Sequence, residues 1–73
     1  MEYANHITTQ MAILGGKPVI TGTRIPVTLV VEEIAGGMTI EELVKEYDLT
    51  RVQIQTALTY AAAALKEDIL VAA

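Results

Sequence analysis

The sequence predicts a mainly α-helical domain: a three-helix, helix-turn-helix bundle of the homeodomain-like type, preceded by a short β-like N-terminal arm or hairpin. Three observations predict this class. Apolar residues fall at helical spacing from residue 26 onward, two helix-start signals follow one another at Thr39 and Thr50, and the first 25 residues contain β-favouring runs beside glycines. We expect residues 1–25 to form the arm and residues 26–73 the helix-turn-helix domain, as one structural unit.

The arm is predicted from three short β-favouring runs at residues 7–9, 19–20 and 23–25. The last two runs flank Thr21-Gly22, and the stretch Gly15–Pro18 has the composition of a turn. A small hairpin is therefore expected here.

The first helix is expected to begin with Pro26 and to end before Gly36. Proline suits a first helical turn, because its φ is already helical and its missing N–H would have no partner there. Gly36 and Gly37 tolerate left-handed φ and so can end the helix. The residues expected on its buried face are Val27, Val30, Val31, Ile34 and Ala35.

The second helix has a complete start signal. Thr39 is placed to cap it, and Glu42 three positions later completes a capping box. Met38 before the cap and Leu43 after it fit a hydrophobic staple. The expected buried face consists of Ile40, Leu43, Val44 and Tyr47.

The same signal is then repeated for a third helix. Thr50 is the expected cap, Gln53 closes the capping box, and Leu49 with Ile54 forms the staple. A short turn therefore joins the second and third helices, as in a helix-turn-helix, where the later helix of the pair reads DNA. The residues expected on the buried face of the third helix are Ile54, Leu58, Ala61, Leu65 and Ile69.

Polar residues of types that bond to bases or phosphates gather on the opposite face of this helix. Two further cations lie in the arm, at Lys17 and Arg24. The candidate DNA-binding residues are Lys17, Arg24, Thr50, Arg51, Gln55, Thr56 and Thr59. In an alternative interpretation these side chains are merely solvated, and Arg24 pairs with Glu32 or Glu33 of the first helix.

Composition predicts self-association. The chain has 73 residues, 52% of them hydrophobic, with no cysteine, and so small a domain is marginally stable alone. We expect a homodimer that packs through the alanine-rich part of the third helix and the apolar end of the chain. The candidate interface residues are Ala62, Ala63, Ile69, Leu70 and Val71.

Several function classes are not expected. The chain lacks serine and cysteine, so the nucleophiles of many hydrolases are absent, and we expect neither catalytic residues, nor a cofactor, nor a small-molecule substrate. A single histidine, His6, without cysteine cannot build a zinc site, so no metal is expected. The apolar runs are too short to span a membrane, and the start of the chain does not resemble a signal peptide, which together with the lack of cysteine favours the cytoplasm.

The residues also resemble a known family. The run Ile13–Ile20, the run Gly22–Val27, the run Gly37–Glu42 and the later Tyr47 and Ala57–Ala61 are similar to the domain-of-unknown-function 433 family, over roughly residues 6–66. The resemblance implies a helix-turn-helix fold. It also implies an antitoxin role, in which the protein dimerises, represses its own operon and masks a PIN-like ribonuclease toxin.

Two main functions are thus open, beside a third in which the chain is an acidic structural subunit with no regulatory role. One is an antitoxin-type regulator that binds a double-stranded DNA operator. The other is a protein-interaction module that masks a partner without binding DNA, which the net charge of −4 favours. Because DNA binding by cations weakens steeply with salt, salt dependence separates the two.

Overall fold

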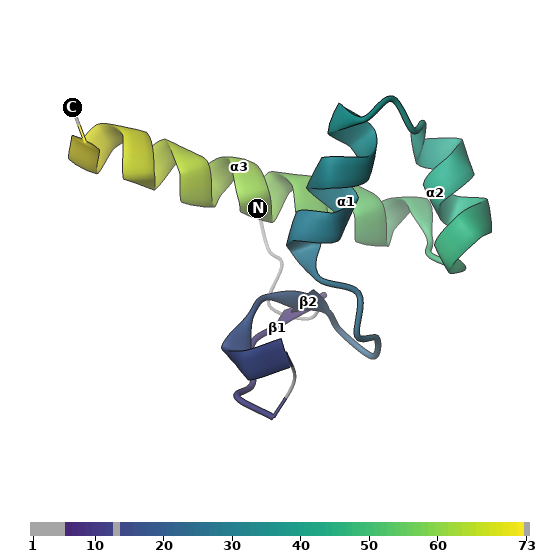
Figure 1. Cartoon of the computed structure of the whole chain (residues 1–73), viewed down its shortest axis with the longest axis horizontal. Coiled ribbons are helices and arrows are strands. Elements are labelled where there is room, and N and C mark those ends of the chain that lie inside the picture. Colours follow the sequence, from purple (N-terminus) through teal and green to yellow (C-terminus); the bar gives the residue numbers. More distant parts are fainter. Residues whose placement is uncertain (1–5, 13, 73) are drawn as a thin grey trace.

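The computed structural model describes residues 6–12 and 14–72. Side chains are described up to residue 66. Three helices follow a short two-stranded hairpin (Figure 1), which confirms the predicted fold class. The elements in chain order are β1 (Ile7–Thr8), the 3-10 turn η1 (Leu14–Gly16), β2 (Val19–Ile20), α1 (Val27–Ala35), α2 (Ile40–Tyr47) and α3 (Arg51–Ala72).

The hairpin pairs β1 with β2 in antiparallel fashion, with Ile7 opposite Ile20. The prediction of β structure at residues 23–25 is wrong. A tight turn intervenes instead, because Gly22 adopts a φ of 82° and the Thr23 N–H and hydroxyl both donate to the Ile20 carbonyl, at 3.0 and 2.7 Å. Beyond this turn the Ile20 N–H donates to the Ile25 carbonyl at 2.9 Å, and Val19 forms an isolated bridge with Pro26.

Helix α1 begins one residue later than expected. Pro26 is its N-cap, with an extended ψ of 150°, and Val27 donates its N–H to the Pro18 carbonyl at 3.0 Å. The helix ends as predicted at the glycines, because Gly37 takes a φ of 107°. The N–H of Met38 then donates to the Glu33 carbonyl at 2.9 Å, which closes a Schellman motif.

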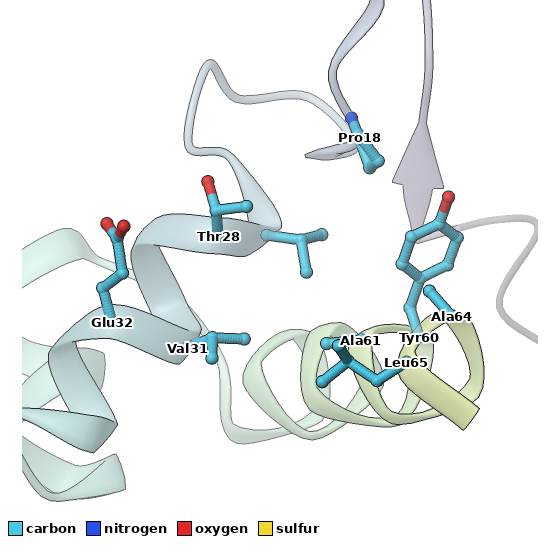
Figure 2. A pocket seen from close by; sticks show the side chains of 9 residues that line it. Pro18, Thr28, Val31, Glu32, Tyr60, Ala61, Ala64 and Leu65 are labelled. Carbon is cyan, nitrogen blue, oxygen red and sulfur yellow. The ribbon is translucent and has the colours of Figure 1, made fainter. Parts of the chain in front are cut away.

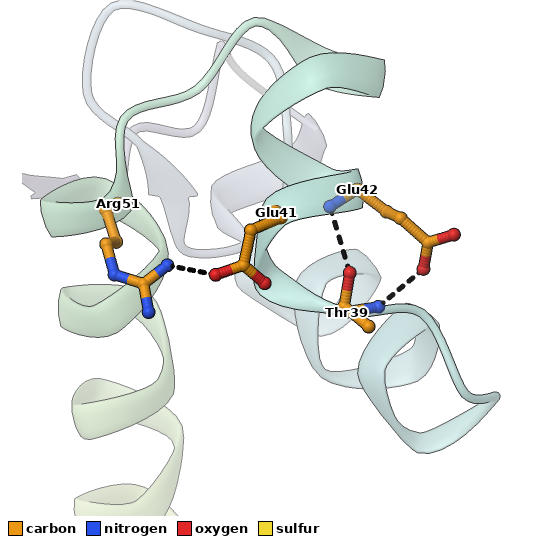
Figure 3. A network of polar contacts seen from close by, with 4 residues as sticks. All are labelled: Thr39, Glu41, Glu42 and Arg51. Atoms are coloured by element: carbon orange, nitrogen blue, oxygen red, sulfur yellow. Dashed lines mark hydrogen bonds and ion pairs between the residues drawn. The ribbon is translucent and has the colours of Figure 1, made fainter.

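Both predicted capping boxes are confirmed. Thr39 accepts the N–H of Glu42 at 3.1 Å, while the Glu42 carboxylate accepts the N–H of Thr39 at 2.8 Å (Figure 3). Thr50 and Gln53 make the same reciprocal pair at 3.1 and 2.7 Å. Asp48 ends α2 in the left-handed conformation, so a turn of residues 48–50 joins α2 to α3.

One core joins the hairpin to the helices. Its buried residues are Ile20, Val27, Val30, Leu43, Leu49, Ile54 and Ala57. The predicted staple residue Leu49 is among them, so the turn between α2 and α3 is anchored in the core.

The expected core face of α3 is only partly buried. Ile54 is fully buried, but Leu65 is 58% exposed, so its prediction as a core residue is wrong. The physical reason is that the C-terminal part of α3 extends past α1 and the hairpin (Figure 1), and helical periodicity cannot tell where the covering elements end. Ile69 lies outside the residues whose side chains are described.

A hydrogen bond ties α1 to α2. The Tyr47 hydroxyl donates to Glu33 Oε2 at 2.7 Å. This bond to a carboxylate raises the pKa of Tyr47, with desolvation as a smaller cause. Within the described part of the chain, no helix is long and apolar enough to cross a membrane.

Candidate functional site

The start of α3 presents an exposed polar surface directly after the turn. Arg51 and Gln55 are both exposed there, and Lys66 is exposed further along the helix. At about 100° per residue, Gln55 lies about 40° around the helix from Arg51, and Lys66 lies close to both directions. We call Arg51, Gln55 and Lys66 the polar face of α3.

An ion pair holds Arg51 against the preceding helix. Its Nη1 lies 2.8 Å from Glu41 Oε2, and the two side chains are 64% and 71% exposed (Figure 3). The pKa of Glu41 is lowered, chiefly by a hydrogen bond from its own backbone at the start of α2 and next by Arg51. Exposed pairs of this kind are weak, so Arg51 can exchange Glu41 for another anion.

Two of the candidate threonines have their hydroxyls engaged locally. Thr50 Oγ1 accepts the N–H of Gln53 at 3.1 Å and serves as the cap of α3. Thr59 Oγ1 donates to the carbonyl of Gln55 at 3.0 Å. Thr50 therefore caps the helix and Thr59 bonds within it, which leaves Arg51 and Gln55 as the groups on this surface best able to reach a ligand.

Thr56 is not part of the polar face, and its prediction as a DNA-binding residue is wrong. It is only 1% exposed. The sequence placed it at the flank of the polar face, but the body of the molecule covers that side of α3. A buried hydroxyl cannot contact DNA while the domain is folded.

The two cations of the N-terminal arm are exposed. Lys17 follows η1 and Arg24 follows the turn at Gly22. Neither forms an ion pair with a described residue, so the alternative pairing of Arg24 with Glu32 or Glu33 is not formed here. Both cations are thus available to an anionic partner.

The predicted dimer residues fall on different parts of α3. Ala62 is exposed and Ala63 is half-buried. Ala62 follows Gln55 by seven residues, about two helical turns, so it shares the direction of the polar face. Ile69, Leu70 and Val71 lie outside the residues whose side chains are described. A dimer packed on Ala62 would therefore compete with any ligand of the polar face.

An apolar groove of about 340 Å³ lies between α1, α3 and Pro18 (Figure 2). Helix α1 contributes Val27, Thr28, Val31 and Glu32, and α3 contributes Tyr60, Ala61, Ala64 and Leu65. We call this surface the α1–α3 groove. Glu32 is the charged residue among these described lining side chains, and Figure 2 places it at one end of the groove.

Sequence reasoning missed this groove. It combines three segments distant in the chain, and its exposed residue Leu65 is one that helical spacing predicts for the core. The available signal was the alanine run beside Leu65, because small residues leave room against a neighbouring helix.

Comparison with known proteins identifies the family. The family described as "Protein of unknown function (DUF433)" matches residues 7–61, well over half of the chain. The chain belongs to this family. The resemblance seen in the sequence is thereby confirmed. The fold is similar to the crystal structure of a DUF433 member protein from Anabaena variabilis ATCC 29413, with a TM-score of 0.80 and 29% identity over 96% of this chain and 71% of that chain. No curated protein matches the chain at a significant level.

Proposed function

We propose that the chain is a small DNA-binding regulator of the antitoxin type, which binds its own operator as a dimer and masks a PIN-like ribonuclease toxin. The observation that carries the DNA-binding part is the polar face of α3, which follows a turn of residues 48–50. The second helix of such a pair enters the major groove. The masking part rests on the resemblance to antitoxins. In this role the protein binds its partners without catalysing a reaction, and it acts in the cytoplasm.

The two exposed side chains suit different parts of DNA. The amide of Gln55 has the donor and acceptor that match an adenine edge in the major groove. Arg51 suits a phosphate, once it leaves Glu41 at 2.8 Å. Lys17 and Arg24 would add phosphate contacts from the arm, which matters for a chain of net charge −4.

Titration of the purified chain with labelled DNA from upstream of its own gene tests this role. Fluorescence anisotropy is measured with scrambled DNA as competitor. We expect selective binding that Gln55→Ala weakens and makes less selective. The neighbouring Thr56→Val is the control, because that side chain is buried, and its folding is checked by circular dichroism. Binding no stronger than that of scrambled DNA, with or without the product of the adjacent gene, would contradict the proposal.

The second candidate is a protein-interaction module that masks a partner without binding DNA. Two observations favour it: the net charge of −4, and the pairing of Arg51 with Glu41. The same titration separates the candidates. A module of this kind binds the adjacent gene product and shows no selective, salt-sensitive affinity for DNA.

A further inference from the structure

Two apolar surfaces of this molecule lie side by side without being covered by its described residues. The first is the α1–α3 groove, in which Leu65 is 58% exposed. The second is the segment between β1 and β2, described at residues 9–12 and 14–18, which we call the 9–18 loop; Met11 is 81% and Leu14 is 43% exposed there. Pro18 belongs to both, because it ends the loop and lines the groove.

Their charges are complementary. Lys17 is the charged residue of the 9–18 loop and is exposed. Glu32 is the charged residue among the described side chains that line the groove, and it is exposed as well. An apolar loop that carries one cation thus matches an apolar groove that carries one anion.

We infer that the 9–18 loop of one copy of this chain docks in the α1–α3 groove of a second copy, and that the second copy returns the same contact. In a two-fold dimer the same patch is used on both partners. Because loop and groove adjoin at Pro18, a two-fold axis near this residue brings each loop onto the other groove. The inference specifies the surface of the dimer assumed in the proposed function.

A dimer contact would cover apolar surface that this small domain exposes. An interface of ordinary size covers about 800 Å² of each partner, which is about one sixth of the 5029 Å² surface of this chain. The excess of apolar residues in so small a domain is then covered by the partner.

The groove dimer leaves the polar face of α3 open. Ala61, Ala64 and Leu65 line the groove, and at about 100° per residue they lie about 120°, 180° and 80° around α3 from Gln55. A dimer packed on Ala62, in contrast, would cover that face. The groove contact is therefore compatible with DNA bound at the same time.

The first test is the mass in solution of matched variants across the micromolar range, by sedimentation equilibrium. The wild-type chain is expected at twice its 7.9 kDa monomer mass. Leu65→Gln should shift it to the monomer, whereas Val52→Gln should not, because Val52 is equally exposed at 60% but does not line the groove. Leu14→Asn should also give the monomer, and asparagine tolerates the φ of 49° found there.

Charge-reversal variants of Lys17 and Glu32 test whether the contact forms between two copies of the chain. Lys17→Glu and Glu32→Lys should each weaken the dimer, because like charges then face each other. An equimolar mixture of the two variants should restore it, since both contacts of the mixed dimer again join opposite charges. The mixture is decisive because no rearrangement within one chain could produce this rescue.

Three results would overturn the inference: a wild-type monomer at every concentration, a dimer that Leu65→Gln and Leu14→Asn leave intact, or a mixture that stays monomeric. Each is distinguishable from failure of the proposed function, because DNA binding is titrated on the same samples. If the wild-type chain binds its operator while the groove variants stay dimeric, the groove contact is refuted and the proposed function is not.

Discussion

Two leucines that periodicity alone treats as equivalent are expected to differ sharply in their effect on stability. Leu43 in α2 is fully buried, whereas Leu65 in α3 is 58% exposed. Leu43→Ala removes buried methyl groups and leaves a cavity, which typically costs about 3–5 kcal/mol. Leu65 has less than half of its surface buried, so Leu65→Ala should lower the free energy of unfolding by less than about 1.5 kcal/mol. Alanine is also the better helix former, which reduces the loss further.

The difference is large beside the stability of the whole domain. At about 0.05–0.15 kcal/mol per residue, a chain of 73 residues is stable by about 4–11 kcal/mol. Urea unfolding followed by circular dichroism measures both variants. With an m-value near 1 kcal/mol/M, Leu43→Ala should lower the midpoint by about 3 M or leave the chain unfolded. The experiment is run at a low and a high protein concentration, which separates folding from any dimer contact of Leu65. Equal losses for the two variants at low concentration would refute the burial assigned to α3.

The remaining predictions concern polar contacts. Thr50→Ala should lower the free energy of unfolding by about 1 kcal/mol, because it removes the cap of α3; an unchanged urea midpoint would contradict this. Glu41→Gln should raise DNA affinity in the anisotropy titration, because Arg51 loses its internal anion, and equal or weaker binding would argue against Arg51 as a phosphate ligand. The pKa of Glu41 is lowered from 4.5, chiefly by its backbone hydrogen bond and next by Arg51, so its carboxylate contributes stability above that value and loses it as the pH falls through the lower folded pKa; acid titration of Glu41→Gln should lack this loss. Since its bond to Glu33 raises the pKa of Tyr47 above 10.0, that contribution is present below 10.0 and lost at higher pH, and Tyr47→Phe should remove the tyrosinate absorbance that Tyr47 contributes in this higher range.

The sequence predicts the local features of this fold well. The two capping boxes and the glycine end of α1 depend on residues within five positions of each other, so spacing suffices to find them. The turn between α2 and α3 follows from them. The hairpin was predicted less completely, because Thr23 uses its hydroxyl to make a turn where its β propensity favours a strand.

What spacing could not predict is which side of α3 the rest of the molecule covers. Thr56 is buried and Leu65 is exposed, although their positions on the helix favoured the reverse. The partner of Arg51 was also missed, because Glu41 lies ten residues earlier in another helix. The α1–α3 groove depends on the same tertiary information, since Pro18 reaches it from the hairpin.

The central claim is that the polar face of α3 binds DNA. Its most direct test is the salt dependence of operator affinity for the wild-type chain and for Arg51→Ala. We expect the logarithm of affinity to fall linearly with the logarithm of salt concentration, and the slope to decrease by about one in Arg51→Ala. Identical slopes, or an affinity that does not change with salt, would contradict contact between this face and DNA.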